Sequence, residues 1–299
     1  MKERKTARVA LLLLPALFAL SCNAPAPSPE SRTPASAQEK VILASFYPVY
    51  IMTINIAQGV PGVRVANLTK PTTGCLHDFA LKSEDMIAIA HATAFIVNGA
   101  GMESFLGKIE KTRPGLPVID ASRGIPLLNN NPHVFVSVTL AMDQVRNITE
   151  GLAGLDPANA PLYRRNSEAY LVKLTALKTR MHDSLQGLSS RDIITLHEAF
   201  PYFAQEFDLN IAAAIEKDPG SEPTAAELAV LIRTIREKKV RAIFAEPQYP
   251  SNIPGLLARE TGAKTYALDP CVMGPDSPGA YIAIMDRNAA VLRKALAHP

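Results

Sequence analysis

Three of the six histidines follow segments that are predicted to be strands, and so does one aspartate. They are His77, His133, His197 and Asp269. In open parallel sheets, ligands bind beyond the carboxyl ends of the strands, so these side chains are expected to face one cleft. Three imidazoles and one carboxylate make a tetrahedral set that suits Zn(II), whereas Mn(II) prefers more oxygen ligands. The pattern therefore predicts a zinc site, although a single histidine is more often structural.

Acidic residues accompany these histidines. Asp78 and Glu198 each follow a histidine directly, and Glu246 comes after another predicted strand, "RAIFA". Carboxylates that accept an imidazole N–H orient metal-binding histidines, and we expect this supporting role for all three. The alternative for Asp78 and Glu198 is that they are solvated loop acids.

Two cysteines flank the predicted ligands. Cys75 lies two residues before His77, and Cys271 lies two residues after Asp269. Three interpretations remain open: two isolated thiols, a possible disulfide between Cys75 and Cys271 across the cleft, or a thiol that binds the metal. Direct ligation ranks last, because four other residues already fill a tetrahedral shell.

Catalytic motifs are absent from the sequence. It contains no Walker motif and no G-x-S-x-G segment, and "HEAF" at His197 lacks the second histidine of a zincin helix. A zinc hydrolase with Glu198 or Glu246 as general base would need an open coordination position, whereas four protein ligands close the shell. The sequence therefore favours a binding protein over an enzyme, with no catalytic residues.

The elements that must position these residues alternate between strands and helices, which predicts α/β lobes with mainly parallel sheets. Two sets of four strands are expected, "VILASF", "VRVANL", "AFIVN" and "PVID", then "DIITL", "NIAAAI", "RAIFA" and "KTYAL". Between the sets, apolar residues recur at steps of three and four from Tyr170 to Leu188. With Asp156 as N-cap and Pro157 at the first helical position, this segment predicts one long rigid helix over 156–188 that joins lobes 40–155 and 189–299.

The N-terminus resembles an export signal. Residues 1–21 combine a basic head with a short apolar run, and "ALSC" resembles the lipobox of bacterial lipoproteins, in which Cys22 is lipidated. Residues 22–39 are rich in Pro, Ala and Ser, which predicts an extended tether. The signal holds four of the 31 basic and one of the 28 acidic side chains, so the mature chain is balanced and does not attract nucleic acid.

With these residues identified, the chain resembles the metal-binding substrate-binding proteins of bacterial ABC importers, particularly the zinc branch. The similarity extends over nearly the whole mature chain and includes "LHDFALKSEDM", "NPHVFV", "TLHEAFPYFAQEF", "FAEPQYP" and "ETGAKTYALDP". It implies two four-stranded lobes bridged by one long helix, with metal ligands at His77, His133, His197 and Asp269. A histidine at position 197 is typical of the zinc branch, since the manganese binders of the family have Glu there. The resemblance also implies that Glu246 orients the metal ligands without binding the ion.

The resemblance implies a function as well as a fold. The expected protein is an exported, lipid-anchored monomer, on the outer face of the cytoplasmic membrane or in the periplasm, which delivers Zn(II) to an ABC permease and its ATPase. Alternatives from the same family are a manganese or iron receptor and a surface adhesin.

Overall fold

A parallel four-stranded sheet forms the core of the N-terminal lobe in the computed structural model, which describes residues 39–70, 73–76, 79–216 and 220–297. The strand order is β2-β1-β3-β4, and every neighbouring pair is parallel. The central strand β1 carries three consecutive buried residues, Ile42–Ala44, as expected for a strand covered on both faces. The strands are β1 (Lys40–Ala44), β2 (Val63–Asn67), β3 (Ala94–Val97) and β4 (Val118–Asp120).

The C-terminal lobe repeats this arrangement with strand order β6-β5-β7-β8, again parallel throughout. Successive residues of β5 point to opposite faces: Ile193 joins the larger hydrophobic core, and Ile194 joins a smaller core under α7 and α8. The two sheets confirm the predicted α/β fold with two four-stranded lobes. The strands are β5 (Asp192–Thr195), β6 (Asn210–Ala214), β7 (Ala242–Ala245) and β8 (Lys264–Ala267).

Helices cover both sheets, and several begin at the expected residues. Thr224 caps α7: its hydroxyl accepts the Glu227 N–H, and the Glu227 carboxylate accepts the Thr224 N–H. The N-terminal lobe holds α1 (Tyr47–Ile56), α2 (Ser83–His91), α3 (Leu106–Thr112), the 3-10 helix η1 (Val134–Val136) and α4 (Val138–Leu155). The C-terminal lobe holds α6 (Pro201–Glu206), α7 (Ala225–Glu237), α8 (Ile253–Thr261) and α9 (Ala280–Leu296).

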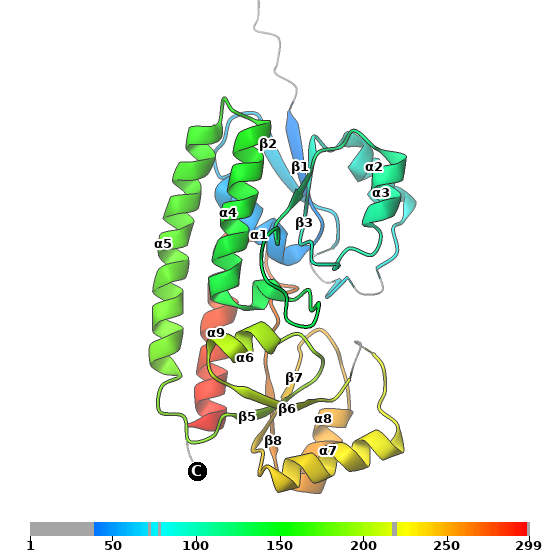
Figure 1. The fold of residues 1–299 in the computed structure, drawn as a ribbon, viewed down its shortest axis with the longest axis vertical. Coiled ribbons are helices and arrows are strands. Elements are labelled where there is room, and N and C mark those ends of the chain that lie inside the picture. The colour runs from blue at the N-terminus through cyan, green and yellow to red at the C-terminus, as the bar shows by residue number, and fades with distance from the viewer. Residues whose placement is uncertain (1–38, 71–72, 77–78, 217–219, 298–299) are drawn as a thin grey trace, which may run out of the picture. The chain divides into compact units, whose positions relative to one another are not determined.

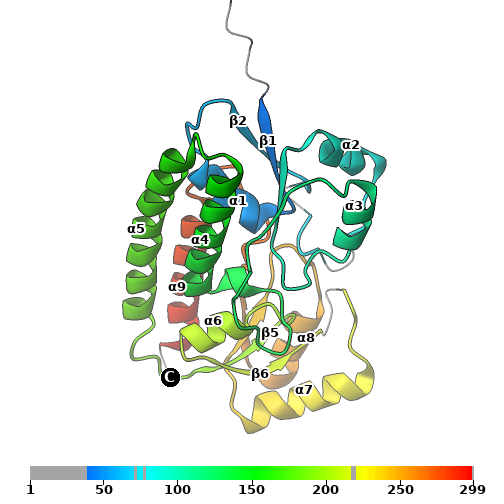
Figure 2. The same cartoon turned by 45° about the horizontal axis from the view of Figure 1, so that its top comes forward.

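The long connecting helix is α5 (Ala160–Ser184), with 25 residues and a length of about 38 Å at 1.5 Å per residue. Figures 1 and 2 show α5 beside α4 at one end and beside α9 at the other. The helix is shorter at both ends than the predicted range 156–188. Asp156 is the C-cap of α4, its carboxylate accepts hydrogen bonds from Lys40 and Tyr163, and Asn159 is the N-cap of α5.

The two lobes share one hydrophobic core. Gln38–Pro299 forms a single compact unit, and the larger cluster of buried residues runs from β1 through α4 and α5 to α9. No helix among the described residues is long and apolar enough to cross a membrane. The predicted signal, Cys22 and nearly all of the predicted tether lie outside the described residues.

Candidate metal centre

Cys75 enters the site from the loop that follows β2. Its backbone N–H donates to Tyr249 Oη at 3.2 Å, a contact between the N-terminal lobe and the loop after β7. The preceding residue, Gly74, has φ +81°, and a Cβ on it would lie 3.1 Å from Tyr249 Oη. Glycine at this position therefore allows both the left-handed backbone and the close approach of the tyrosine.

His133 lies in the loop between β4 and η1, where the amide of Asn131 holds it. Asn131 Oδ1 is 2.9 Å from His133 Nδ1 and also accepts the His133 backbone N–H at 2.9 Å. Tyr202, on α6 of the C-terminal lobe, donates its hydroxyl to the Asn131 carbonyl at 2.6 Å. Residues from both lobes thus fix this imidazole.

His197 follows β5, and Glu246, the first residue after the neighbouring strand β7, faces it. Glu246 Oε1 lies 2.6 Å from His197 Nδ1 and accepts the His197 backbone N–H at 3.3 Å. Gln248 donates to the other carboxylate oxygen at 2.7 Å. Burial raises the pKa of Glu246, and the hydrogen bond from His197 opposes this effect. This arrangement is the supporting contact expected for a metal-binding histidine.

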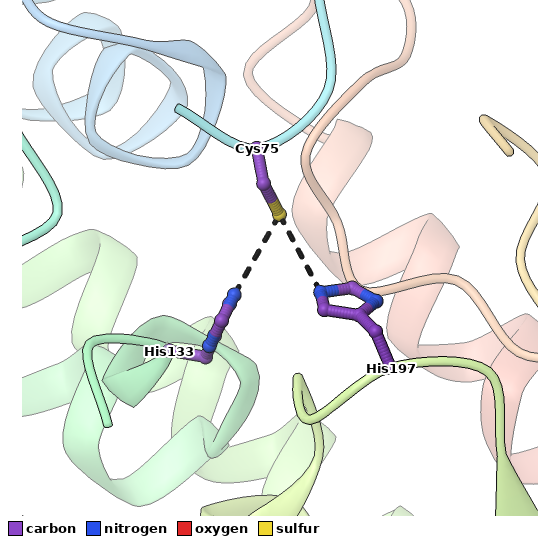
Figure 3. Close-up of side chains that lie close together, drawn as sticks. All are labelled: Cys75, His133 and His197. Carbon is purple, nitrogen blue, oxygen red and sulfur yellow. Dashed lines mark hydrogen bonds between the residues drawn. The ribbon is translucent and has the colours of Figure 1, made fainter. Parts of the chain in front are cut away.

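The loops bring three donor atoms together. Cys75 Sγ lies 3.7 Å from His133 Nε2 and 3.9 Å from His197 Nε2, and all three side chains are buried (Figure 3). The three donor atoms lie within 4.8 Å of one another, close enough to share one metal ion. Burial, together with the Glu246 carboxylate, raises the pKa of the Cys75 thiol.

Asp269, the predicted carboxylate ligand, follows β8 and does not belong to this group of three. Its Oδ1 accepts the Cys271 N–H at 2.8 Å, and its pKa is raised, chiefly by burial. Asn288 on α9 holds its backbone: the Asn288 side chain accepts the Asp269 N–H at 3.0 Å and donates to the Asp269 carbonyl at 2.7 Å. The aspartate is thus firmly placed at the end of its strand.

The remaining predicted site residues are His77, Asp78, Glu198 and Glu246. His77 and Asp78 lie outside the described residues. Glu198 has an exposed side chain, and its backbone carbonyl accepts the Asn131 side-chain N–H at 2.7 Å. Its role in orienting an imidazole remains a prediction. Glu246 contacts His197 Nδ1, and its supporting role remains a prediction.

The possible disulfide between Cys75 and Cys271 is not formed in the structure, where both residues are free and buried thiols. The reason lies in their surroundings. Cys75 faces the two imidazoles, whereas Cys271 is fully buried in the core and lies near Tyr170 and Tyr281.

Three residues with a clear positioning role were not identified from the sequence: Asn131, Tyr249 and Asn288. Asn131 stands two residues before His133 in an Asn-rich turn, and Tyr249 stands three residues after Glu246, so proximity in sequence is a usable signal for both. Asn288 lies in the middle of a helix that is distant in sequence, and only the fold shows its contact with Asp269.

Comparison with known proteins shows the family to which the chain belongs. Residues 42–295 match the family model described as zinc-uptake complex component A, periplasmic. The high-affinity zinc uptake system protein ZnuA of Bacillus subtilis is 31% identical over 89% of this chain and 92% of its own length. The zinc-binding lipoprotein AdcA of Streptococcus pneumoniae is 26% identical over 96% of this chain, which spans only 60% of AdcA.

A solved structure shows the same fold. The substrate-binding protein FpvC of Pseudomonas aeruginosa, in complex with Mn2+, is 31% identical and superimposes with a TM-score of 0.80 over 87% of this chain and 98% of its own. With a family match over nearly all of the described residues, this chain belongs to the family of periplasmic zinc-uptake component A proteins.

Proposed function

We propose that this protein is an extracytoplasmic receptor that captures Zn(II) between its two lobes and delivers it to an ABC permease driven by an ATPase. One observation carries the proposal. The Nε2 atoms of His133 and His197, from different lobes, converge within a buried group while Asn131 and Glu246 hold their Nδ1 atoms. An oxygen acceptor at Nδ1 leaves the lone pair of a neutral imidazole on Nε2, where a metal binds.

The proposed ligand set keeps the four predicted residues: His77, His133, His197 and Asp269. Nitrogen ligands from imidazole favour Zn(II) over Mn(II) at such a site. Membership of the zinc-uptake family and the zinc-binding names of the similar proteins support the same cargo. The manganese-bound FpvC structure makes Mn(II) the alternative to test.

Binding without catalysis is the proposed mode of action. Both oxygens of Glu246 are hydrogen-bonded, one to His197 and the other to Gln248, which suits a positioning residue better than a general base. Glu198, the other candidate base, has an exposed side chain. We further propose that the protein is a monomer held at the membrane through a lipidated Cys22.

Calorimetry of metal-free protein with Zn(II) and with Mn(II) tests the proposal. We expect tight 1:1 zinc binding and much weaker manganese binding, and His133→Ala or His197→Ala should abolish the zinc signal. His182→Ala is the matched control, because His182 is a half-exposed residue on α5, and it should bind zinc like the parent. Manganese binding as tight as zinc binding would refute the zinc assignment.

A further inference from the structure

The sulfur atom of Cys75 lies where a metal ligand would lie. It is 3.7 Å from one imidazole Nε2 and 3.9 Å from the other. We propose that Cys75 is itself a ligand, so that one thiolate sulfur binds the transported ion together with His133 and His197 and takes the tetrahedral position of one of the other two ligands proposed above, His77 or Asp269. This inference rests on the proposed metal-binding function and assigns a sulfur donor to the same site.

The distances fit a tetrahedral ion. With a Zn–S bond of about 2.3 Å and a Zn–N bond of about 2.05 Å, a tetrahedral angle places the sulfur and nitrogen about 3.6 Å apart. The observed separations exceed this value by only a few tenths of an ångström. Both sulfur-to-nitrogen separations are therefore close to those of a shared tetrahedral ion, and the three donor atoms lie within 4.8 Å of one another.

A thiol–imidazole hydrogen bond alone does not account for this geometry. A thiol has one proton and can donate it to one nitrogen, yet Sγ lies at nearly equal distances from two. Each imidazole has an oxygen atom facing Nδ1, an arrangement that favours the tautomer with its proton on Nδ1 and makes Nε2 the metal-binding nitrogen. A sulfur and two imidazole nitrogens that face one another at these distances form a donor set that a cation can bind.

The backbone around Cys75 is positioned by the loop that also orients His197. Within this loop, Glu246 accepts from His197 Nδ1, and three residues later Tyr249 accepts the Cys75 N–H. Gly74 makes the second contact possible because a side chain there would crowd Tyr249 Oη. One loop of the C-terminal lobe thus fixes a nitrogen donor of its own lobe and the sulfur donor of the other.

Sulfur changes the metals that the site prefers. Thiolate is a soft ligand that selects zinc and other thiophilic ions, whereas Mn(II) favours oxygen. A sulfur ligand would therefore lower the affinity of this site for Mn(II) relative to Zn(II). The similar protein FpvC, which has the same fold, was solved with Mn2+ bound.

Absorption spectroscopy of Co(II)-substituted protein tests the proposal directly. We expect the parent protein to show visible bands of tetrahedral Co(II) and an intense near-ultraviolet sulfur-to-cobalt charge-transfer band. Cys75→Ser should lose the charge-transfer band and keep the visible bands. Cys271→Ser is the matched control, since Cys271 is an equally buried thiol outside the group of three, and it should keep both.

A second measurement needs no variant and separates this inference from the proposed function. X-ray absorption of the zinc-loaded protein should show a sulfur neighbour at about 2.3 Å together with lighter ligands. Tight zinc binding with only nitrogen and oxygen neighbours, or a charge-transfer band that persists in Cys75→Ser, would overturn the sulfur ligand and leave the receptor function intact. Failure of the parent protein to bind zinc at all would overturn both.

Discussion

The imidazoles of His133 and His197 owe their orientation to the oxygen atoms that face their Nδ1 atoms. Glu246 is the stronger of these partners because it is buried and its Oε1 accepts two hydrogen bonds from His197. A carboxylate at this position raises the basicity of the imidazole and fixes its tautomer. Metal affinity should therefore depend on a residue that does not touch the ion.

Replacing this carboxylate tests its contribution. Glu246→Gln should lower zinc affinity by about 10- to 100-fold, because the amide keeps the shape but loses the charge that strengthens the donor. Competition with a chelator of known affinity measures the change. Glu198→Gln is the control and should leave affinity unchanged, since the Glu198 side chain is exposed. Equal losses in both variants would contradict the assigned role of Glu246.

Strand ends predicted the proximity of two candidate site residues. His197 and Glu246 stand at the ends of neighbouring parallel strands, and their contact follows from the sheet order. Cys75 was ranked last as a ligand because four other residues already completed a shell. Sequence spacing does not show that the loop turns at Gly74 and directs the thiol toward two imidazoles of distant segments.

Among the elements, α4 shows how close packing limits substitution. Gly151 faces strand β4, and a Cβ on Gly151 would lie 2.7 Å from Ile119 Cγ2. Gly154, three residues further along the same helix, has no atom within 4 Å of the corresponding position. The two glycines therefore differ in what faces them.

This difference predicts opposite effects of the same substitution. Gly151→Ala should destabilise the protein by about 1–3 kcal/mol, because the added methyl forces β4 away from the helix. Gly154→Ala should stabilise it by up to about 1 kcal/mol through helix propensity. Denaturant unfolding of both variants measures the changes. A stabilising Gly151→Ala would show that β4 and α4 separate easily.

The elements themselves were largely predictable, and their ends were less so. All eight strands were expected from short apolar runs between turns, because parallel strands covered on both faces carry such runs. The start of α5 was misplaced, since Asp156 followed by Pro157 has the composition of a helix N-terminus. In the fold, Asp156 binds Lys40 of β1 instead, so a tertiary contact overrides the local signal.

For the whole molecule, the lobes are held together by hydrogen bonds as well as by their shared core. The Glu206 carboxylate of α6 accepts hydrogen bonds from the Ser137 and Thr139 hydroxyls at the start of α4. Tyr47 and Tyr281 each donate to a backbone carbonyl of the opposite lobe, at Pro275 and Phe135 respectively. These contacts oppose a wide hinge motion.

Small-angle scattering should therefore detect no large domain closure. We expect metal-free and zinc-loaded protein to give superimposable curves, because opening the lobes would break buried hydrogen bonds and expose the shared core. Metal entry then needs only local movement of the loops around the site. A clear decrease in the radius of gyration on zinc binding would contradict this expectation.

The position of α9 has a consequence for how the chain reaches its native state. This last helix donates from Tyr281 to the N-terminal lobe, holds the Asp269 backbone through Asn288, and pairs with α5 through Asp286 and Arg180. Neither lobe can complete its contacts until these residues have been synthesised. Domains generally fold from the N-terminus during synthesis, but here an element that both lobes need follows the other described helices and strands in the chain. A chain with this order of elements stays incompletely folded until α9 has been synthesised, so both lobes acquire their final contacts together.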